Sequence, residues 1–395
     1  MRYYIIAGEA SGDLHGSNLI RGILEQDPDA HIRCWGGDLM EEAGGTLVKH
    51  YRDLAFMGFV EVISNLGTIM QNLKTCKADV EKFNPDVLVL IDYPGFNLRI
   101  AKWANQKGIK VVYYISPQVW AWKESRVKTI RKHVDRMIVI LPFEKNFYEK
   151  WNFQVDYVGH PLVEVVEEKL NSEDLSITEE SPLSQKNIVA LLPGSRKQEI
   201  LTKLPIMLEA VKAFPGYNFI LAKSSAIPDE FYAPLLEGHP NLRSVRNKTY
   251  SLLMRAKAAL VTSGTATLET ALFDVPQVVC YKGSSISYLI AKRLIKVNYI
   301  SLVNLIMNKP VVKELIQHEL TPENLIRELD RILHDKDAVA KMHEDYLKLK
   351  HLLKEDGKAS AKAAAIVVKE ASTVAGKASV SSQPGKMQED SVEKL

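Results

Sequence analysis

Little in this sequence points to disulfide, metal or membrane-spanning chemistry. Its 395 residues include only three cysteines, Cys34, Cys76 and Cys280, which stand far apart with no C-x-x-C spacing and no His-rich tract. Such cysteines indicate neither a disulfide framework nor a zinc site, so we expect no metal and no cofactor. No stretch approaches the roughly 20 consecutive apolar residues of a membrane span, and the apolar run at the N-terminus is too short for a signal peptide. We therefore expect a cytoplasmic protein with buried, reduced thiols.

A strong charge of either sign is also missing. The formal net charge is +3, which is too small to predict a nucleic-acid partner. Hydrophobic residues make up 46% of the chain and charged residues 25%, as in an ordinary globular protein. A chain of this length can form two domains, each with its own core.

Apolar runs of strand length alternate with helical patterns along almost the whole chain. This alternation is typical of a parallel sheet with helices on both faces, and its repetition predicts an α/β fold of two Rossmann-like parallel-sheet domains that face a cleft. The clearest strands are Tyr3–Ala7, Asp86–Ile91, Val111–Ile115, 188–192, 218–222, 258–262 and 277–281.

The two halves are divided by residues 171–187, a polar segment rich in serine and glutamate. We expect an N-terminal domain over residues 1–165 and a second domain over residues 166–355. A short C-terminal helix is predicted at 356–370. Residues 371–395 are small and polar, and are expected to form a disordered tail.

The most informative segment is 188–199, IVALLPGSRKQE, in which a buried strand ends in a small-residue loop and a polar helix begins. We expect Ser195 to cap this helix. The backbone N–H groups of a helix N-terminus favour an anion, and the planar fork of Arg196 matches phosphate oxygens. The loop Gly194, Ser195 and Arg196 is therefore a candidate phosphate site.

A second loop of the same kind follows in residues 258–270, AALVTSGTATLET. Its candidate binding residues are Ser263, Gly264, Thr265, Thr267 and Glu269, the last of which is available for a ribose hydroxyl. Either loop by itself could be an ordinary strand–helix turn. Two such loops on one sheet, together with Arg196, favour a site for a nucleotide diphosphate.

Carboxylates stand at the ends of two strands of the first domain. Asp92 directly follows the apolar run DVLVLI, where it could act as a general base or cap the following helix. Glu9 and Asp13 belong to the loop GEASGD after the first strand. That loop has neither the G-x-G-x-x-G fingerprint nor the lysine of a Walker A loop, so NAD, FAD and ATP are not expected.

Two apolar features of the first domain each allow two interpretations. The tryptophans Trp120 and Trp122 of SPQVWAW could form a wall for a sugar, or they could be core residues. Residues 54–73 form an apolar patch with basic flanks, which could lie on a membrane or accept an acyl chain, but which also fits a buried crossover helix. The patch includes Met57, Phe59, Val60 and Ile63.

Eight motifs in series resemble those of the bacterial lipid-A-disaccharide synthase family. They are GEASGD at 8–13, AFMGFVEV at 55–62, IDYPGFN at 91–97, SPQVWAW at 116–122, LPFEKNFY at 141–148, GHPL at 159–162, LLPGSR at 191–196 and TSGTATLE at 262–269. The resemblance runs from about residue 2 to residue 355. It implies an inverting glycosyltransferase of the GT-B fold, which works without a bound metal.

The reaction that the resemblance implies joins UDP-2,3-diacylglucosamine to 2,3-diacylglucosamine 1-phosphate. The products are UDP and a β-1,6-linked disaccharide 1-phosphate on the route to lipid A. The resemblance places the family's catalytic aspartate on Asp92 and the arginine of its Gly-Ser-Arg segment on Arg196. It also matches Asn304 to a substrate-binding segment, and Glu9 and Asp13 to the family's first loop.

Because both substrates carry acyl chains, the resemblance further implies peripheral association with the inner face of the inner membrane. It leaves a homodimer open. The chain departs from the family pattern at Gly95, where an aspartate is usual, and at Gln118, where a serine is common.

Two alternatives also remain, a UDP-N-acetylglucosamine 2-epimerase-like enzyme and a non-catalytic nucleotide-sugar sensor. The apolar patch disfavours the epimerase, and Asp92 disfavours the sensor.

Overall fold

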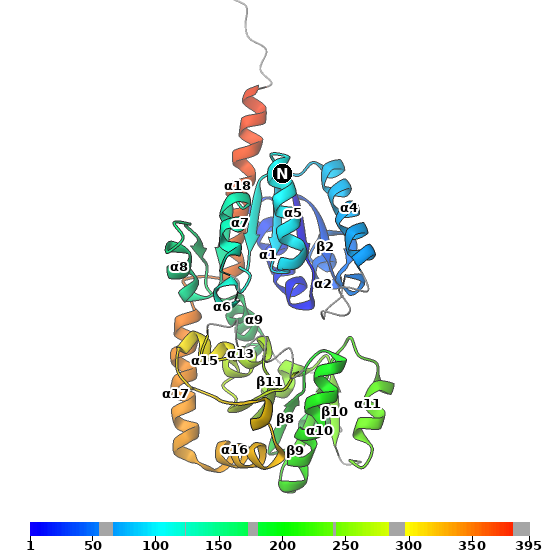
Figure 1. Ribbon diagram of the computed structural model, residues 1–395, viewed down its shortest axis with the longest axis vertical. Coiled ribbons are helices and arrows are strands. Elements are labelled where there is room, and N and C mark those ends of the chain that lie inside the picture. Colours follow the sequence, from blue (N-terminus) through cyan, green and yellow to red (C-terminus); the bar gives the residue numbers. More distant parts are fainter. Residues whose placement is uncertain (55–65, 123, 173–180, 240–241, 284–296, 382–395) are drawn as a thin grey trace, which may run out of the picture.

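The computed structural model of the chain describes residues 1–54, 66–122, 124–172, 181–239, 242–283 and 297–381 (Figure 1). Two parallel sheets, each covered by helices, form two domains that lie one above the other in Figure 1. The predicted pair of Rossmann-like domains is therefore confirmed. Within the described part of the chain, no helix is both long and apolar enough to cross a bilayer.

The first domain is built on a sheet with the strand order β3-β2-β1-β4-β5-β6-β7, and every pair in it is parallel. Its described elements are β1 (Arg2–Ala7), α1 (Ala10–Gln26), β2 (His31–Gly36), α2 (Asp38–Glu42), β3 (Thr46–His50), η1 (Tyr51–Asp53), α4 (Leu66–Phe83), β4 (Val87–Ile91), α5 (Pro94–Gln106), β5 (Val111–Tyr114), α6 (Val119–Trp122), α7 (Arg126–His133), β6 (Arg136–Val139), α8 (Pro142–Glu149) and β7 (Asp156–Tyr157).

The second domain repeats this design with the order β10-β9-β8-β11-β12-β13, again all parallel. Its described elements are α9 (Pro161–Leu170), η2 (Pro182–Ser184), β8 (Ile188–Leu192), α10 (Lys197–Ala213), β9 (Asn218–Lys223), α11 (Asp229–Leu236), β10 (Arg243–Arg246), α12 (Thr249–Leu253), β11 (Ala256–Thr262), α13 (Thr265–Leu272), β12 (Gln277–Tyr281), α15 (Leu302–Met307), β13 (Lys313–Ile316), η3 (Gln317–Glu319), α16 (Pro322–His334) and α17 (Lys336–Leu353).

The central strands explain why the chain folds this way. All five residues of β4 and all five of β8 are buried, because helices cover both faces of each sheet. Polar groups are thus displaced to the strand ends. In each sheet the strand order reverses between two neighbours, β1 and β4 in the first and β8 and β11 in the second. Ligands of such sheets bind outside the carboxyl ends of the strands at this point.

The chain crosses between the domains earlier than expected. It leaves the first domain at Gly159 and His160, and the N–H of His160 donates to the carbonyl of Leu353 on the returning segment, at 3.0 Å. Helix α9 then contributes Leu162 and Val166 to the core of the second domain. The predicted boundary at residue 165 therefore falls inside a helix that packs with the second domain.

The C-terminal helix is longer than predicted. Helix α18 (Ala359–Ser381) returns to the first domain and packs along α1 (Figure 1). It carries Ala371 into the core, so the disordered tail predicted from residue 371 is wrong for 371–381. Residues 382–395 lie outside the described residues.

Small residues allow this helix to approach α1 closely. A methyl group on Gly22 would lie 3.0 Å from the Cβ of Ala364, which is fully buried. Ala364→Leu should therefore overpack the interface and cost about 1–3 kcal/mol, which a thermal melt reads as a lower Tm. Ala365→Leu, on the exposed side of the same helix, is the matched control and should change little. Equal melting temperatures for the two variants would contradict this packing.

Candidate active site

Asp92 lies at the carboxyl end of β4, beside the point where the order of the first sheet reverses. Asp92 and Tyr93 both have left-handed backbone conformations, with φ of 42° and 48°. Such strain in residues other than glycine is held only by its surroundings, and it gathers at functional sites. Here the side-chain amide of Asn97 and the hydroxyl of Tyr113 donate to the carbonyl of Asp92 at 2.8 and 2.5 Å.

The alternative role of Asp92 as a helix cap does not fit this turn. The N-cap position of α5 belongs to Tyr93, which makes no side-chain capping hydrogen bond. Burial instead raises the pKa of the Asp92 carboxyl to about 7, with a smaller upward contribution from the charge of Glu9 and a downward one from the backbone N–H of Tyr93. A carboxylate that titrates near neutral pH is suited to accept a proton.

The carboxyl of Glu9 in the first domain interacts with the charge of Arg196 in the second. Glu9 follows β1, the strand that pairs with β4. Burial raises the pKa of its carboxyl, and the positive charge of Arg196 in the second domain opposes that shift. The structure therefore brings together Asp92, Glu9 and Arg196, three of the residues singled out from the sequence.

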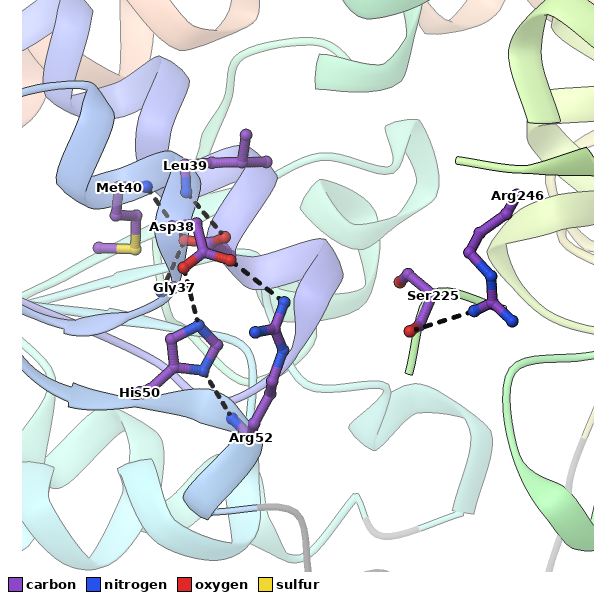
Figure 2. Close-up of polar contacts among 9 residues, drawn as sticks. Gly37, Asp38, Leu39, Met40, His50, Arg52, Ser225 and Arg246 are labelled. Atoms are coloured by element: carbon purple, nitrogen blue, oxygen red, sulfur yellow. Dashed lines mark hydrogen bonds and ion pairs between the residues drawn. The ribbon is translucent and has the colours of Figure 1, made fainter. Parts of the chain in front are cut away.

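Asp13 has a different part. It is buried, and its carboxylate accepts the backbone N–H groups of Gly37, Leu39 and Met40 at 2.7, 3.2 and 3.1 Å. Figure 2 shows the Leu39 and Met40 nitrogens with their dashed contacts at the start of α2. Because three amides already hold both of its oxygens, Asp13 secures the start of α2, and this arrangement argues against a role as proton acceptor.

The loop after β8 is in contact with a carboxylate of the chain itself, that of Glu199. Helix α10 begins at Lys197 with Arg196 as N-cap, one residue later than the predicted cap at Ser195. The carboxylate of Glu199 accepts the N–H of Ser195 at 3.2 Å and lies 3.5 Å from the guanidinium of Arg196. Gly194 has a φ of 118°, and a Cβ there would lie 2.3 Å from Glu199 Oε2. The loop thus has the donors and the shape for an oxyanion.

Glu199 was not among the predicted site residues, although a sequence signal for it exists. It stands at the third position of the helix, where a glutamate commonly reaches back to the free N–H groups at the start. That spacing could have identified it from the sequence alone.

The loop after β11 exposes the start of α13. Gly264 and Thr265 are exposed, and a Cβ on Gly264 would meet open space. Ser263 donates to the carbonyl of Ile300 at 3.0 Å. Thr267, in contrast, is fully buried and its hydroxyl donates to Gly264 at 2.8 Å, so it stabilises the turn from inside.

Glu269 and Asn304 differ in what they leave free for a ligand. Glu269 accepts the hydroxyl of Tyr250 at 2.6 Å, and burial raises the pKa of its carboxyl. The side-chain nitrogen of Asn304 donates to Val312 and Glu314, both at 2.9 Å, and its oxygen accepts the N–H of Val312. Three of its four hydrogen-bonding positions are taken, which favours a structural role over the expected contact with substrate.

Trp120 is a core residue, so the idea that it forms a sugar-stacking wall is wrong. It is 7% exposed, its indole N–H donates to Glu144 at 3.2 Å, and its ring packs edge-on against Phe143. The side chain of Trp122 and the patch residues Met57, Phe59, Val60 and Ile63 lie outside the described residues. Across the described ranges, no group of three or more His, Cys, Asp or Glu side chains could hold a metal ion.

The fold and the loops define the class of protein. Two solved structures of the same architecture are the glycosyltransferase of kitacinnamycin, with a TM-score of 0.64 over 93% of this chain and 98% of that one, and the UDP-GlcNAc 2-epimerase from Neisseria meningitidis, with 0.63 over 93% and 99%. Their identities of 13% and 14% show a shared fold alone. This is the GT-B fold of glycosyltransferases.

The sequence comparisons are more specific than the fold. The family profile described as Lipid-A-disaccharide synthetase matches residues 3–368. A lipid-A-disaccharide synthase of Trichlorobacter lovleyi is 42% identical over 341 residues, covering 85% of this chain and 89% of the relative. One of Geobacter metallireducens is 43% identical over 340 residues, covering 85% and 88%. The chain belongs to the lipid-A-disaccharide synthase family and is a glycosyltransferase of lipid A biosynthesis.

Proposed function

We propose that this enzyme transfers the sugar of UDP-2,3-diacylglucosamine, with inversion, to 2,3-diacylglucosamine 1-phosphate. The observation that carries the proposal is the carboxyl of Asp92, at the carboxyl edge of the first sheet with a pKa of about 7. Family membership supports a lipid A glycosyltransferase, and the base, the substrates and the stereochemistry are our inference.

In the proposed mechanism, ionised Asp92 takes the proton of the acceptor's C6 hydroxyl as that oxygen attacks C1 of the donor sugar. The bond from C1 to the diphosphate oxygen breaks at the same time, and UDP leaves from the opposite face. A β-1,6 linkage results, the proton rests on Asp92, and no covalent enzyme intermediate forms. Burial keeps the pKa of Asp92 high, and the like charge of Glu9 raises it further.

The second domain supplies the leaving-group site. The N–H of Ser195, the guanidinium of Arg196 and the start of α13 at Gly264 and Thr265 offer donors where negative charge develops on UDP. The diphosphate takes the place of the Glu199 carboxylate, which holds the same donors in the free protein. In this proposal Glu269, which accepts the hydroxyl of Tyr250, also accepts a ribose hydroxyl.

The decisive experiment incubates pure protein with UDP-2,3-diacylglucosamine, with and without the acylated acceptor. We expect UDP release that requires the acceptor, and kcat/KM that falls as the pH drops through about 7, because Asp92 then becomes protonated. Asp92→Asn should lower kcat by about 10²–10⁴-fold. Conversion of UDP-N-acetylglucosamine to its C2 epimer, without need of an acceptor, would instead identify an epimerase.

Two further measurements test Asp92 as the base, one by the pH profile and one by thermal stability. Glu9→Gln removes the negative charge beside Asp92, so the acidic limb of its pH profile should move to lower pH. Because the pKa of Asp92 is raised in the folded state, its ionised form opposes folding above about pH 7. Asp92→Asn should therefore melt no lower than wild type at pH 8, and a wild-type rate in that variant would reject Asp92 as the base.

Arg196→Ala tests the leaving-group site. Loss of a charge-assisted contact of about 1.5–3 kcal/mol should weaken UDP-sugar use by roughly 10–150-fold, and Arg196→Lys should recover only part because the planar fork is lost. Lys212→Ala is the matched control, since Lys212 lies at the other end of α10 and is paired with Glu209 in the same way. Steady-state kinetics with unchanged KM for the UDP-sugar in Arg196→Ala would contradict the assignment.

We also propose that the protein associates with the membrane surface through the patch 54–73, since both substrates are acylated. In the described part of that segment, Met70 is 54% exposed on α4, and Lys74, Lys77 and Lys82 follow on the same helix. Met57→Ser with Phe59→Ser should reduce co-sedimentation with phosphatidylglycerol vesicles and leave Tm nearly unchanged. Leu347→Ser with Leu352→Ser, two exposed leucines of α17, is the matched control.

A large drop in Tm for the patch double variant would show that these residues are core, because buried large-to-small changes cost about 2–5 kcal/mol each. Association into a homodimer stays an open expectation, which sedimentation velocity decides.

A further inference from the structure

A polar cluster that the mechanism does not use lies at the end of β3, the edge strand of the first sheet. Figure 2 shows Asp38 in contact with the imidazole of His50 and the guanidinium of Arg52. The Asp38 carboxylate is 3.1 Å from Arg52 Nη2 and 3.4 Å from His50 Nε2. Asp38 and Arg52 have side chains that are 60% and 59% exposed. The Asp38 carboxylate therefore lies between a guanidinium and an imidazole and is open to solvent.

His50 is fixed as one of these donors. Its Nδ1 accepts the backbone N–H of Arg52 at 3.1 Å, so the hydrogen of the neutral ring is on Nε2. This Nε2 atom is buried and has no hydrogen-bond partner among the described residues, although the Asp38 carboxylate lies beside it. A buried donor without a hydrogen bond is uncommon, and its place beside an anion indicates an acceptor site.

Packing holds both donors in place. The ring of Tyr51 lies 4.6 Å from the ring of His50, and the guanidinium of Arg52 lies 5.9 Å from the centre of the Tyr51 ring. Tyr51 in turn sits against Gly37, where a Cβ would come within 2.4 Å of its ring. Gly37 directly follows β2, and its N–H donates to Asp13. The cluster therefore lies at the carboxyl ends of the strands, where the proposed base also lies.

The distance between the cluster and Asp92, measured across the carboxyl ends of the strands, can be compared with the size of the acceptor sugar. In the order β3-β2-β1-β4, the end of β3 is three strands from Asp92, which is about 14 Å between strand axes. Glu9 and Gly37 follow the two strands between them. A hexose with its C6 hydroxyl at Asp92 carries its C1 substituent at the opposite side of the ring, and the long side chain of Arg52 shortens the remaining distance.

We propose that His50 and Arg52 bind the anomeric phosphate of the acceptor, a phosphomonoester that replaces the carboxylate of Asp38. This inference rests on the proposed function, because that reaction supplies an acceptor with a phosphate on C1. The two donors match such a group, since a guanidinium fork and an imidazole N–H both donate to phosphate oxygens. Asp38, in the exposed first turn of α2, turns out to solvent when phosphate binds. The diphosphate of the donor has its own loops in the second domain, so the two anions do not compete.

The test compares two acceptors, 2,3-diacylglucosamine 1-phosphate and the corresponding methyl glycoside, which lacks the phosphate. Wild type should use the phosphorylated acceptor better in kcat/KM by about tenfold or more. Arg52→Ala should lose most of this preference through a higher KM for the phosphorylated acceptor. The same variant should keep the wild-type rate with the methyl glycoside and the wild-type KM for the UDP-sugar. Arg52→Lys should recover part of the preference.

The matched control is Lys107→Ala, which removes an exposed cation paired with Glu81. Lys107 follows α5 and precedes β5, so it lies near the amino ends of the strands, away from the cluster, and its loss should leave the preference intact. Absence of transfer by wild type overturns the proposed function and this inference together. Active wild type with an Arg52→Ala variant that retains the preference, or that loses both acceptors equally, overturns the phosphate site alone.

Discussion

The proposed catalytic edge depends on the parallel pairing of β1 with β4. In this ladder Ala7 lies beside Ile91, so the residues that follow the two strands, Glu9 and Asp92, emerge next to each other. Both strands are buried on both faces, and the low dielectric around their ends makes two negative charges costly. Burial therefore raises the pKa values of both carboxyls; the charge of Glu9 adds to the rise at Asp92, and the charge of Arg196 opposes the rise at Glu9. A shift of register by one residue would separate the pair and turn every side chain of the strand to the other face.

Three carboxylates, those of Asp13, Glu199 and Asp38, contact donors of the chain itself, and they differ in how far they are buried. Asp13 is 3% exposed and holds three amides at the start of α2, so it is part of the fold. The side chains of Glu199 and Asp38 are 28% and 60% exposed and hold donors at the two proposed phosphate positions. An exposed carboxylate loses little when a phosphate replaces it, because water solvates it again. A carboxylate thus stabilises the fold in one place, and in two others it holds the donors that we propose for a phosphate.

The fold alone leaves the activity open. UDP-GlcNAc 2-epimerases and glycosyltransferases both share this architecture with the chain at low identity, which agrees with the general observation that function lies in the site and not in the fold. The distinction comes from the family match. In the first domain the charge of Arg196 from the second domain acts on Glu9, the neighbour of Asp92, and these are the groups that the proposed transfer would use.

Much of this protein is determined by local sequence. Continuous apolar runs such as 188–192 and Asp86–Ile91 predicted β8 and β4, because a strand covered on both faces has no polar side, and the loops that follow them located Arg196 and Asp92. Other features depend on residues far apart in the chain. Asp13 binds amides 24 to 27 residues away, Trp120 meets Glu144 in the core, and α18 packs on α1 across most of the sequence. Periodicity reports which face of an element is apolar, but not which distant backbone group will meet a given side chain. The tertiary structure therefore decided that Asp13 and Trp120 support the fold, and that His50, Arg52 and Asp38 meet at one edge, because only packing brings a buried polar group and its partner together.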